Sequence, residues 1–256
     1  MTLAAITRKI SQNINSCELT HIGRNSIDLD KARTQHAEYE RLLADLGCNL
    51  RSLPAEPDLP DSVFVEDTAV VLDEAAVITR PGAESRRPET ESIARALHGD
   101  RDLVYIEEPG TLDGGDVLLL DRTLYCGLTS RSNRAGREQL RELVAPFGYT
   151  VLGVDINGCL HLKTAVTRCA AGTVLLNPDW VDRQQFGSLR LIEVDPREPF
   201  AANCLCIGEK VVYASAFPRT RERLEKKGLA VRGLDLSELA KAEGAVTCCS
   251  LLFYTR

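Results

Sequence analysis

Apolar and polar positions recur along the chain in one order: an amphipathic helix, a glycine, and then a short apolar strand. In the first unit, Tyr39, Leu42, Leu43 and Leu46 repeat at the spacing of one helix face. Glycine suits the left-handed residue that often ends a helix. The pattern predicts five such units, with turns at Gly47, Gly99, Gly148, Gly187 and Gly228. The fourth helix is predicted within PDWVDRQQFG, residues 178–187.

Between these units lie pairs of strands, each an apolar run, a polar turn and a second apolar run. The pairs are AVVLDEAAVITR, DVLLLDRTLYCG, TAVTRCAAGTVLLN and NCLCIGEKVVYAS. The units recur about every 40–50 residues, a period typical of repeat and propeller folds. We therefore expect an α/β protein whose units surround an axis, with a ligand site in the central channel. An open α/β sheet with coincidental spacing is the alternative.

Composition agrees with a globular fold and excludes one class of expected binding partner. Hydrophobic residues make up 44% and charged residues 27%, and the formal net charge is -6. Nucleic acid is not an expected partner, because binding it needs a basic surface. The proline-rich SLPAEPDLPD is short and leads into a strand, so we expect a shaped loop and one domain over residues 1–256.

The N-terminal sequence has no signal-peptide pattern, and no apolar stretch is long enough to span a bilayer. We therefore expect a cytoplasmic protein without a membrane partner. The nine cysteines lack the spacing of a small disulfide framework, and free thiols are expected.

The segment GAVTCCSLLFYTR holds two adjacent cysteines in a run of strand-forming residues. If it is a strand, successive side chains point to opposite faces. Cys249 would then share the more apolar face with Leu251 and Phe253, and Cys248 would face the channel. A buried, inert cysteine remains the alternative for either thiol.

A nucleophilic cysteine needs a histidine and an orienting acid. His36 and His98 lie on predicted helices, where we expect surface positions, and His21 lies in an early loop. His161 follows an Asn-Gly turn and precedes a strand, a position common for catalytic groups. A purely structural histidine is the alternative there.

Two groups of acids come directly before apolar strands. They are Asp61, Glu66 and Asp67 in the first group, and Asp113 and Asp116 in the second. Carboxylates gathered at strand ends around an axis would form a pocket suited to a guanidinium. Gly114 and Gly115 would let the backbone approach a ligand closely. A solvated acidic surface is the alternative.

A metal site is not expected, because CLH and CLC lack the spacing of structural zinc ligands. The sequence also has no phosphate-binding glycine loop and no dinucleotide fingerprint.

Seven segments match one family in order along nearly the whole chain. They are PDSVFVEDTAVV, ITRPGAESRRPET, GTLDGGDVL, SRSNRAG, LHLKTAVT, AANC and VTCCS. Together they resemble the dimethylarginine dimethylaminohydrolases of the guanidine-modifying amidinotransferase superfamily. The resemblance implies the pentein fold, a five-bladed αβ propeller with pseudo-five-fold symmetry and its active site in the central channel.

The resemblance also implies roles for individual residues. Cys248 would be the nucleophile, His161 the acid and base, and Asp113 the third catalytic residue. Members differ at two of the positions, with Glu in place of Asp113 or Asp in place of Glu243. The implied substrate-binding residues are Leu19, Asp61, Phe64, Glu66, Asp67, Arg86, Arg131 and Val246.

Within that set, Glu66 and Asp67 would bind the guanidinium, and Asp61 the amino-acid end of the substrate. Arg86 and Arg131 would bind its α-carboxylate. Leu19 would belong to a mobile lid, CELTHIG.

The implied reaction is hydrolysis of Nω-methylated L-arginine to L-citrulline and a methylamine through a covalent cysteine thiouronium, without a cofactor. The implied partner is the small-molecule substrate, and a homodimer stays open. Three alternatives remain: an arginine or agmatine deiminase, a non-catalytic propeller resembling ribosome anti-association factors, and a metal-binding regulator.

Overall fold

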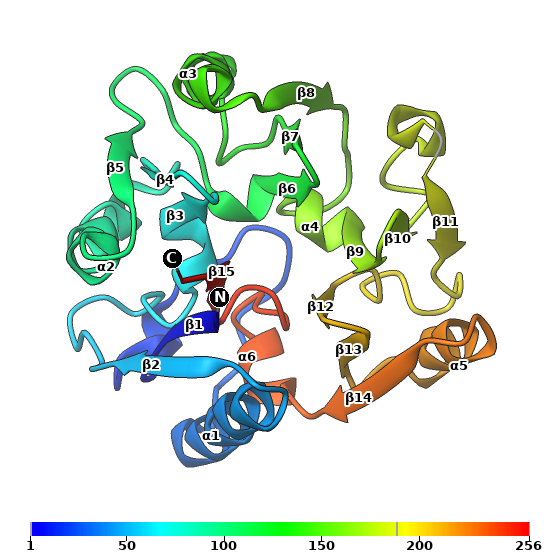
Figure 1. Ribbon diagram of the computed structural model, residues 1–256. Helices are drawn as coiled ribbons and strands as arrows, with labels where there is room; N and C mark the ends of the chain where they lie inside the picture. The colour runs from blue at the N-terminus through cyan, green and yellow to red at the C-terminus, as the bar shows by residue number, and fades with distance from the viewer. Residues whose placement is uncertain (1, 188, 256) are drawn as a thin grey trace.

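The structure is a computed structural model that describes residues 2–187 and 189–255. Five three-stranded sheets surround a central axis (Figure 1). This arrangement confirms the predicted αβ propeller, and the open-sheet alternative is wrong. The sheets are β3(Ala69–Val71)-β4(Ala75–Ile78)-β5(Asp102–Tyr105), β6(Val117–Leu120)-β7(Thr123–Gly127)-β8(Thr150–Val154), β9(Val166–Ala170)-β10(Thr173–Leu176)-β11(Arg190–Glu193), β12(Cys204–Ile207)-β13(Lys210–Ala214)-β14(Ala230–Leu234) and β15(Leu251–Tyr254)-β1(Leu3–Arg8)-β2(Asn49–Leu53).

Every blade is built in the same way. In the second one, β7 pairs antiparallel with β6 and parallel with β8. A parallel pair needs a crossover connection, and a helix supplies it in most blades. The first strand of each sheet lies nearest the axis and the third lies at the rim (Figure 1). The repeated order of the sequence therefore becomes a repeated radial order in space.

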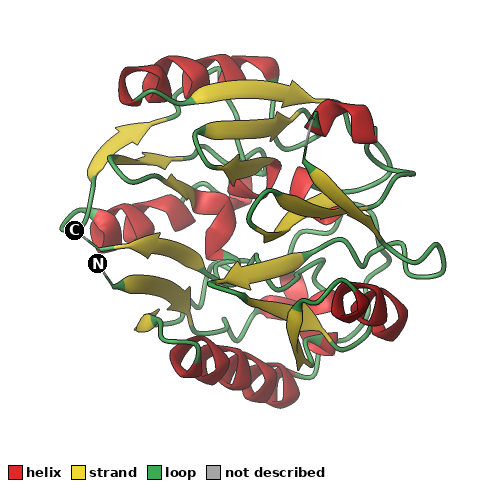
Figure 2. Cartoon of the chain, turned by 45° about the vertical axis from the view of Figure 1, so that its right-hand side comes forward, coloured by secondary structure: helices red, strands yellow, loops and turns green. Residues whose placement is uncertain are grey.

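The long helices lie outside the strands. Figure 2 shows two of them at the top and bottom edges of the molecule. The glycines Gly47, Gly148 and Gly228 take φ values of 79–92°, as expected of residues that end helices, whereas Gly99 lies outside the left-handed region. The helices are α1(Leu29–Asp45), α2(Glu89–Leu97), α3(Arg134–Val144) and α5(Pro218–Lys226), with the short α4(Leu162–Ala165) and α6(Ser237–Ala240) nearer the axis.

The fourth predicted helix is wrong. Its segment contains a single 3-10 turn, Arg183–Phe186, capped by the carboxylate of Asp182. The preceding Val181 forms an isolated β-bridge with Ile156, so the chain is extended where the helix was expected. Gly187, with φ 55°, ends the turn. Local pairing with the neighbouring blade therefore overrides the helical pattern here.

The two ends of the chain close the ring in one blade. Strand β1 lies between β15, with which it pairs antiparallel, and β2, with which it pairs parallel. The backbone N–H of Thr255 donates to the carbonyl of Thr2 at 2.8 Å. Figure 1 shows both termini beside each other.

The cysteine pair lies in a turn, so the prediction of a strand through Cys248 and Cys249 is wrong. The bonds from the N–H of Cys248 to Ala245 (3.3 Å) and of Ser250 to Thr247 (3.4 Å) are turn bonds, and β15 begins only at Leu251. The two thiols are nevertheless separated as expected. Cys249 is fully buried in the core, and Cys248 is partly exposed.

All the inner strands begin near one end of the axis. Glu66 and Asp67 precede β3, Asp113 precedes β6, His161 precedes β9, and Cys248 precedes β15. The fold therefore brings together side chains that are far apart in the sequence. None of the described helices is long and apolar enough to cross a membrane.

Candidate active site

The turn that carries Cys248 is fixed from several sides. The Tyr39 hydroxyl donates to the carbonyl of Val246 at 2.8 Å and lies 2.7 Å from the Ser250 hydroxyl. The backbone N–H of Thr247 donates to the side chain of Asn203 at 3.1 Å. Val246, expected to bind substrate, is completely buried, and its carbonyl is engaged by Tyr39.

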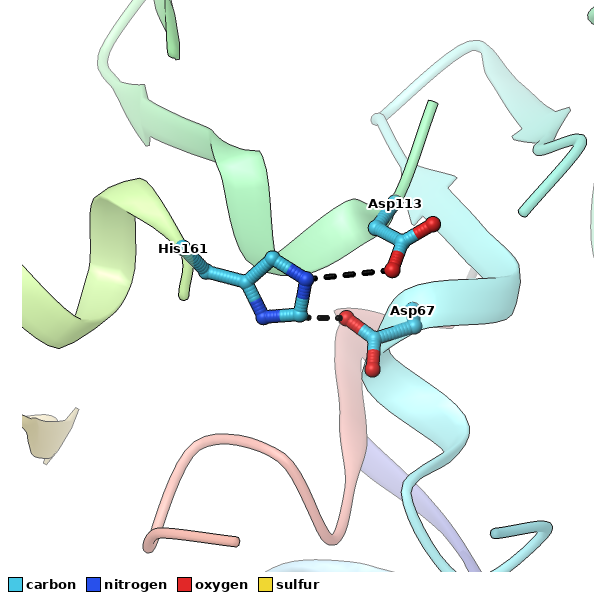
Figure 3. A group of neighbouring side chains, drawn as sticks. All are labelled: Asp67, Asp113 and His161. Atoms are coloured by element: carbon cyan, nitrogen blue, oxygen red, sulfur yellow. Dashed lines mark hydrogen bonds and ion pairs between the residues drawn. The ribbon is translucent and has the colours of Figure 1, made fainter. Parts of the chain in front are cut away.

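His161 stands at the N-terminus of α4, with its ring against Asp113 and Asp67 (Figure 3). Its Nε2 is 3.0 Å from Asp113 Oδ2, and its Nδ1 is 3.9 Å from Asp67 Oδ1. Burial opposes the charged imidazolium, but Asp67, Asp116 and Asp113 outweigh it and raise the pKa of His161 to about 9. At neutral pH the ring is therefore a proton donor.

Gly114 and Gly115 allow the His161 ring and the Glu66 backbone to lie close to this segment. A Cβ on Gly115 would lie 2.6 Å from His161 Nδ1, and one on Gly114 would lie 2.0 Å from the carbonyl oxygen of Glu66. The neighbours that require Gly114 and Gly115 are thus the protein's own site residues, whereas the sequence had suggested a ligand.

Asp67 is held as a carboxylate. Arg86 Nη1 donates to its Oδ2 at 2.6 Å, and the N–H of Gly115 donates to its Oδ1 at 3.0 Å. Burial favours the neutral acid, but His161 and Arg86 outweigh it and lower the pKa of Asp67 to about 2. A second anion therefore faces the imidazole beside Asp113.

Arg86 is itself engaged by the protein. Its Nη2 donates to Glu89 at 2.9 Å and to the carbonyl of Phe64 at 3.1 Å, and its Nε faces Glu89. All three nitrogens of the guanidinium thus have protein partners in this state.

Arg131 has fewer contacts than Arg86. Its Nη2 donates to the Thr20 hydroxyl at 3.1 Å, and its Nη1 lies 3.9 Å from Asp113 Oδ2. It is therefore the freer of the two cations to meet a carboxylate.

Asp116, expected from the sequence only as one of the pocket acids, links the segment of His161 to that of Arg131. Its Oδ1 accepts from the N–H of Leu162, next to His161, at 2.9 Å. Its Oδ2 accepts from the hydroxyls of Thr129 (2.7 Å) and Ser132 (2.6 Å), which flank Arg131. Burial raises the pKa of Asp116 to about 6.

Glu66 lies at the base of the site and is bound there by two side chains. Its Oε1 accepts from Lys163 Nζ at 2.7 Å and its Oε2 from the Thr247 hydroxyl at 2.8 Å. Glu66, Lys163 and Thr247 also line a cavity of about 380 Å³ bounded by the inner strands. Because those strands run away from Cys248 and His161, this cavity lies at the opposite end of the channel. The Glu66–Lys163 pair separates it from the site of Cys248.

The predicted lid lies over the site and is tied to two acids. The N–H of Glu18 donates to Asp61 Oδ2 at 3.0 Å. The N–H groups of Thr20 (2.8 Å), His21 (2.7 Å) and Ile22 (3.2 Å) donate to the carboxylate of Glu243. Leu19 between them is partly buried and packs against the core. Asp61, expected at the amino-acid end of the substrate, meets the lid backbone here.

Two cavities meet at Cys248 and His161. The smaller, about 20 Å³, has charged groups on its walls, and the larger, about 280 Å³, is mostly apolar. Of the predicted set, the smaller one brings together Asp61, Phe64, Asp67, Arg86, Arg131, His161 and Cys248. Glu66 and Val246 line the larger one, and Asp113 lies behind His161.

Several residues that line the site were not predicted from the sequence. Lys163 is two positions beyond His161, and a cation so close to the predicted catalytic histidine could have been noticed. Leu160, Ala242 and Gly244 line the small cavity but carry no chemical signal in the sequence.

One of the dismissed histidines is also placed differently from its prediction. His36 is buried against Glu40, not at the surface, and burial lowers its pKa to about 4. His98 is exposed, as expected.

Asp67, Asp113 and His161 bring one potential metal ligand each within 4.8 Å of one another. Each of these groups already has a protein partner: Arg86 for Asp67, the N–H of Gly82 (2.9 Å) for Asp113, and Asp113 for His161. The arrangement is that of an acid–base pair oriented by protein groups.

The resting thiol of Cys248 is neutral. Burial and the carboxylates of Glu66 and Asp67 raise its pKa well above the ordinary value. Cys249, buried among apolar side chains, also has a raised pKa. The site thus combines a protonated thiol with a protonated imidazole, between carboxylates and Arg131.

Known proteins match this chain over most of its length. The family described as N,N dimethylarginine dimethylhydrolase, eukaryotic, matches residues 7–185. N(G),N(G)-dimethylarginine dimethylaminohydrolase of Pseudomonas aeruginosa is 36% identical over 91% of this chain and 92% of its own. The protein of the same name from Streptomyces coelicolor is 38% identical over 96% of this chain and 95% of its own.

Solved structures are also similar to this chain over nearly its whole length. The P. aeruginosa enzyme, as a cysteine-to-serine variant complexed with citrulline, superposes with a TM-score of 0.94 at 34% identity, covering 99% of this chain and 100% of that one. The N-terminal domain of ArgZ, bound to a reaction intermediate, has a TM-score of 0.86 at 18% identity over 98% of this chain and 97% of that one, and shares the fold. This chain belongs to the dimethylarginine dimethylaminohydrolase family.

Proposed function

We propose that this protein hydrolyses Nω-methylated L-arginine to L-citrulline and a methylamine, with Cys248 as nucleophile and His161 as acid and base. The observation that carries the proposal is the meeting of Cys248, His161 and buried carboxylates at one end of the channel, next to Arg131. Membership of the family supports the same reaction. Residues 1–256 act in it as one catalytic unit.

Substrate binding uses the charged groups of the small cavity together with Glu66, which lines the larger cavity on the other side of Cys248. The guanidinium lies between Glu66 and Asp67, whose carboxylates orient its planar N–H groups. Arg131, helped by Arg86, binds the α-carboxylate, and Asp61 binds the α-amino group once its bond to the Glu18 N–H is released. The lid carrying Leu19 covers the bound ligand.

The chemistry then proceeds in two halves. The Cys248 thiol gives its proton to solvent water as the substrate binds, and the thiolate sulfur adds to the guanidinium carbon. The bond from that carbon to the methylated nitrogen breaks as His161 gives its proton to the departing amine. The neutral His161 next takes one proton from water, whose oxygen adds to the thiouronium carbon. The carbon–sulfur bond breaks, and the departing sulfur takes the remaining proton of that oxygen, which gives citrulline and the neutral thiol. Asp113 and Asp67 stabilise the imidazolium at each stage.

Thiolate formation depends on the substrate. The carboxylates that bind a guanidinium also raise the pKa of the Cys248 thiol, so the empty site holds the thiol neutral. A bound cation offsets those carboxylates and favours the thiolate. Thiolate absorbance should therefore appear at lower pH when a guanidinium ligand is bound. An identical titration with and without ligand would contradict this step.

Product analysis with competing substrates tests the function. Asymmetric dimethylarginine, monomethylarginine, arginine and agmatine are supplied together, and citrulline, methylamines and ammonia are quantified. We expect citrulline with dimethylamine or methylamine. Ammonia from arginine or agmatine as the main product would indicate a deiminase instead, and no product from any guanidine would indicate a binding module.

A further inference from the structure

In the proposed function, the amino-acid part of the substrate binds outside the larger cavity next to Cys248. This cavity shares Leu160, His161, Glu243, Gly244 and Cys248 with the smaller cavity, so the two are continuous at the thiol. The charged groups Asp61, Arg86 and Arg131 line the smaller one only. Most of the larger one's wall is apolar and includes Phe200, Ala216, Phe217, Leu236 and Ala240, while Glu66, Lys163 and Asn203 belong to its polar part.

The two guanidinium-binding acids face different cavities. Asp67 lines the smaller one and Glu66 the larger one. A guanidinium held by both therefore has one edge on each side of Cys248. Since the amino-acid end must lie toward Arg131, the nitrogen on the Glu66 side is the one whose substituents enter the larger cavity.

The larger cavity exceeds what a methylated nitrogen fills. Its volume is about 280 Å³. A methyl group needs roughly the space of a water molecule, about 30 Å³, so two methyl groups leave most of the cavity free. At its rim Phe200 packs edge-on against Trp180, with ring centroids 5.0 Å apart, and remains 46% exposed.

An apolar wall also gives little discrimination by chemistry. A hydrophobic pocket rejects a longer alkyl chain by lack of space. The polar groups Glu66 and Asn203 of this wall would not be left unpaired by such a chain, because Glu66 already pairs with Lys163 and Thr247, and Asn203 with Thr247. With space available, additional methylenes gain contact with Phe200 and Phe217 and are removed from water.

We infer that this cavity, here called the alkyl chamber, is a subsite for the substituent of the reacting guanidine nitrogen, and that the protein hydrolyses Nω-alkyl-L-arginines with groups at least as long as propyl. The inference rests on the proposed function. The step is the same: the Cys248 sulfur bonds to the guanidine carbon, the bond to the alkyl-bearing nitrogen breaks, and His161 supplies the proton with which propylamine leaves. Water then displaces the thiol to give citrulline.

Competing rates test the inference. The value of kcat/KM is measured by citrulline release for Nω-methyl-, Nω,Nω-dimethyl- and Nω-propyl-L-arginine. The wild-type value for the propyl substrate should lie within about tenfold of the methyl value, because even one excluded methylene costs at least about tenfold. Ala216→Leu, an exposed position on the chamber wall, should lower the propyl-to-methyl ratio by about tenfold or more. Ala171→Leu, exposed in the β9–β10 turn, is the matched control and should leave the ratio unchanged.

The outcomes separate this inference from the function on which it rests. Turnover of the methylated substrates with a propyl value more than about tenfold lower would overturn the alkyl chamber and leave the proposed function intact. An unchanged ratio in Ala216→Leu would overturn it as well, because the propyl group would then lie elsewhere. Failure to turn over any methylated arginine would overturn the proposed function first.

Discussion

Cys248 and Cys249 show how neighbouring side chains of one kind take different roles. The turn from Ala245 to Ser250 directs the first thiol to the junction of two cavities and the second into the apolar core. Acidic neighbours surround the first, and hydrophobic side chains surround the second. The reactive thiol is therefore selected by its surroundings.

Substitution of each cysteine by serine should separate these roles. Cys248→Ser should reduce turnover by about 10⁴-fold or more, as the loss of a nucleophile does in other covalent enzymes, with unfolding unchanged. Cys249→Ser places a hydroxyl in the core and should cost about 1–3 kcal/mol in the free energy of unfolding, with most activity retained at low temperature. Citrulline assays and urea unfolding measure the two effects. The reverse pattern would assign the nucleophile to Cys249.

The pKa of His161 sets the expected pH dependence of the reaction. His161 must be protonated to release the amine, so kcat/KM should fall as the pH rises through about 9. Asp113→Asn removes one of the carboxylates that stabilise the imidazolium, and the alkaline limb should move down by about 1–3 pH units. Asp113→Glu keeps the charge and should restore most of the shift. A limb that stays in place in Asp113→Asn would mean that another group controls it.

At the scale of elements, the lid is fastened by a residue with an unusual backbone. Glu243 has φ 58°, a left-handed conformation that is uncommon for a residue with a side chain. In that position its carboxylate accepts from the backbone N–H groups of Thr20, His21 and Ile22. A turn next to the nucleophile thus holds a lid that lies more than 200 residues away in the sequence.

Glu243→Ala should therefore loosen the lid without disturbing the catalytic pair. Hydrogen exchange at the amides of Thr20, His21 and Ile22 should become faster by on the order of tenfold or more, the effect of losing one charge-assisted bond. KM should rise because the covering segment is less ordered. Glu209→Ala, exposed in the β12–β13 turn, is the control. Unchanged exchange at these amides would show that other contacts hold the lid.

The elements also show what the sequence could predict. The strand pairs and four of the five predicted helices follow from local apolar spacing and glycine positions, and the structure contains them. The fourth helix failed because Val181 pairs with Ile156 of another blade. The strand predicted at Cys248 is wrong because hydrophobic periodicity does not show the turn bonds that the carbonyls of Ala245 and Thr247 accept. Both errors lie where contacts between distant segments decide the backbone.

The same limit applies to the candidate site. Acids placed directly before apolar strands indicated the pocket, because they stand where the inner strands begin. The bonds that define its present state, such as Glu66 to Lys163 and Asp61 to the lid N–H of Glu18, join separate blades and loops. No spacing within one segment could have predicted them.

At the scale of the whole molecule, the ring depends on the blade that both termini build. Strand β1 is buried from Ala4 to Arg8 and pairs with β15 on one side and β2 on the other. Because β15 follows the turn of Cys248, closing the ring also places the nucleophile. The architecture and the position of the catalytic thiol are therefore coupled.

Circular permutation tests this coupling, since Thr2 and Thr255 are hydrogen-bonded to each other. A permutant whose ends are joined by a short flexible linker, with new termini opened at Gly208 in the β12–β13 turn, keeps every blade and should retain cooperative unfolding and activity, as exposed turns tolerate new ends. Deletion of residues 1–8 from the original chain removes the central strand of the closing blade and should abolish both, because β2 and β15 then lose their partner. Thermal unfolding and citrulline release are measured on both proteins. An active, cooperatively folded deletion variant would contradict the coupling, because the other blades would then hold the nucleophile turn without β1. An active permutant together with an unfolded deletion variant would support it. Pairing within this blade would then be required, and chain continuity through Gly208 would not.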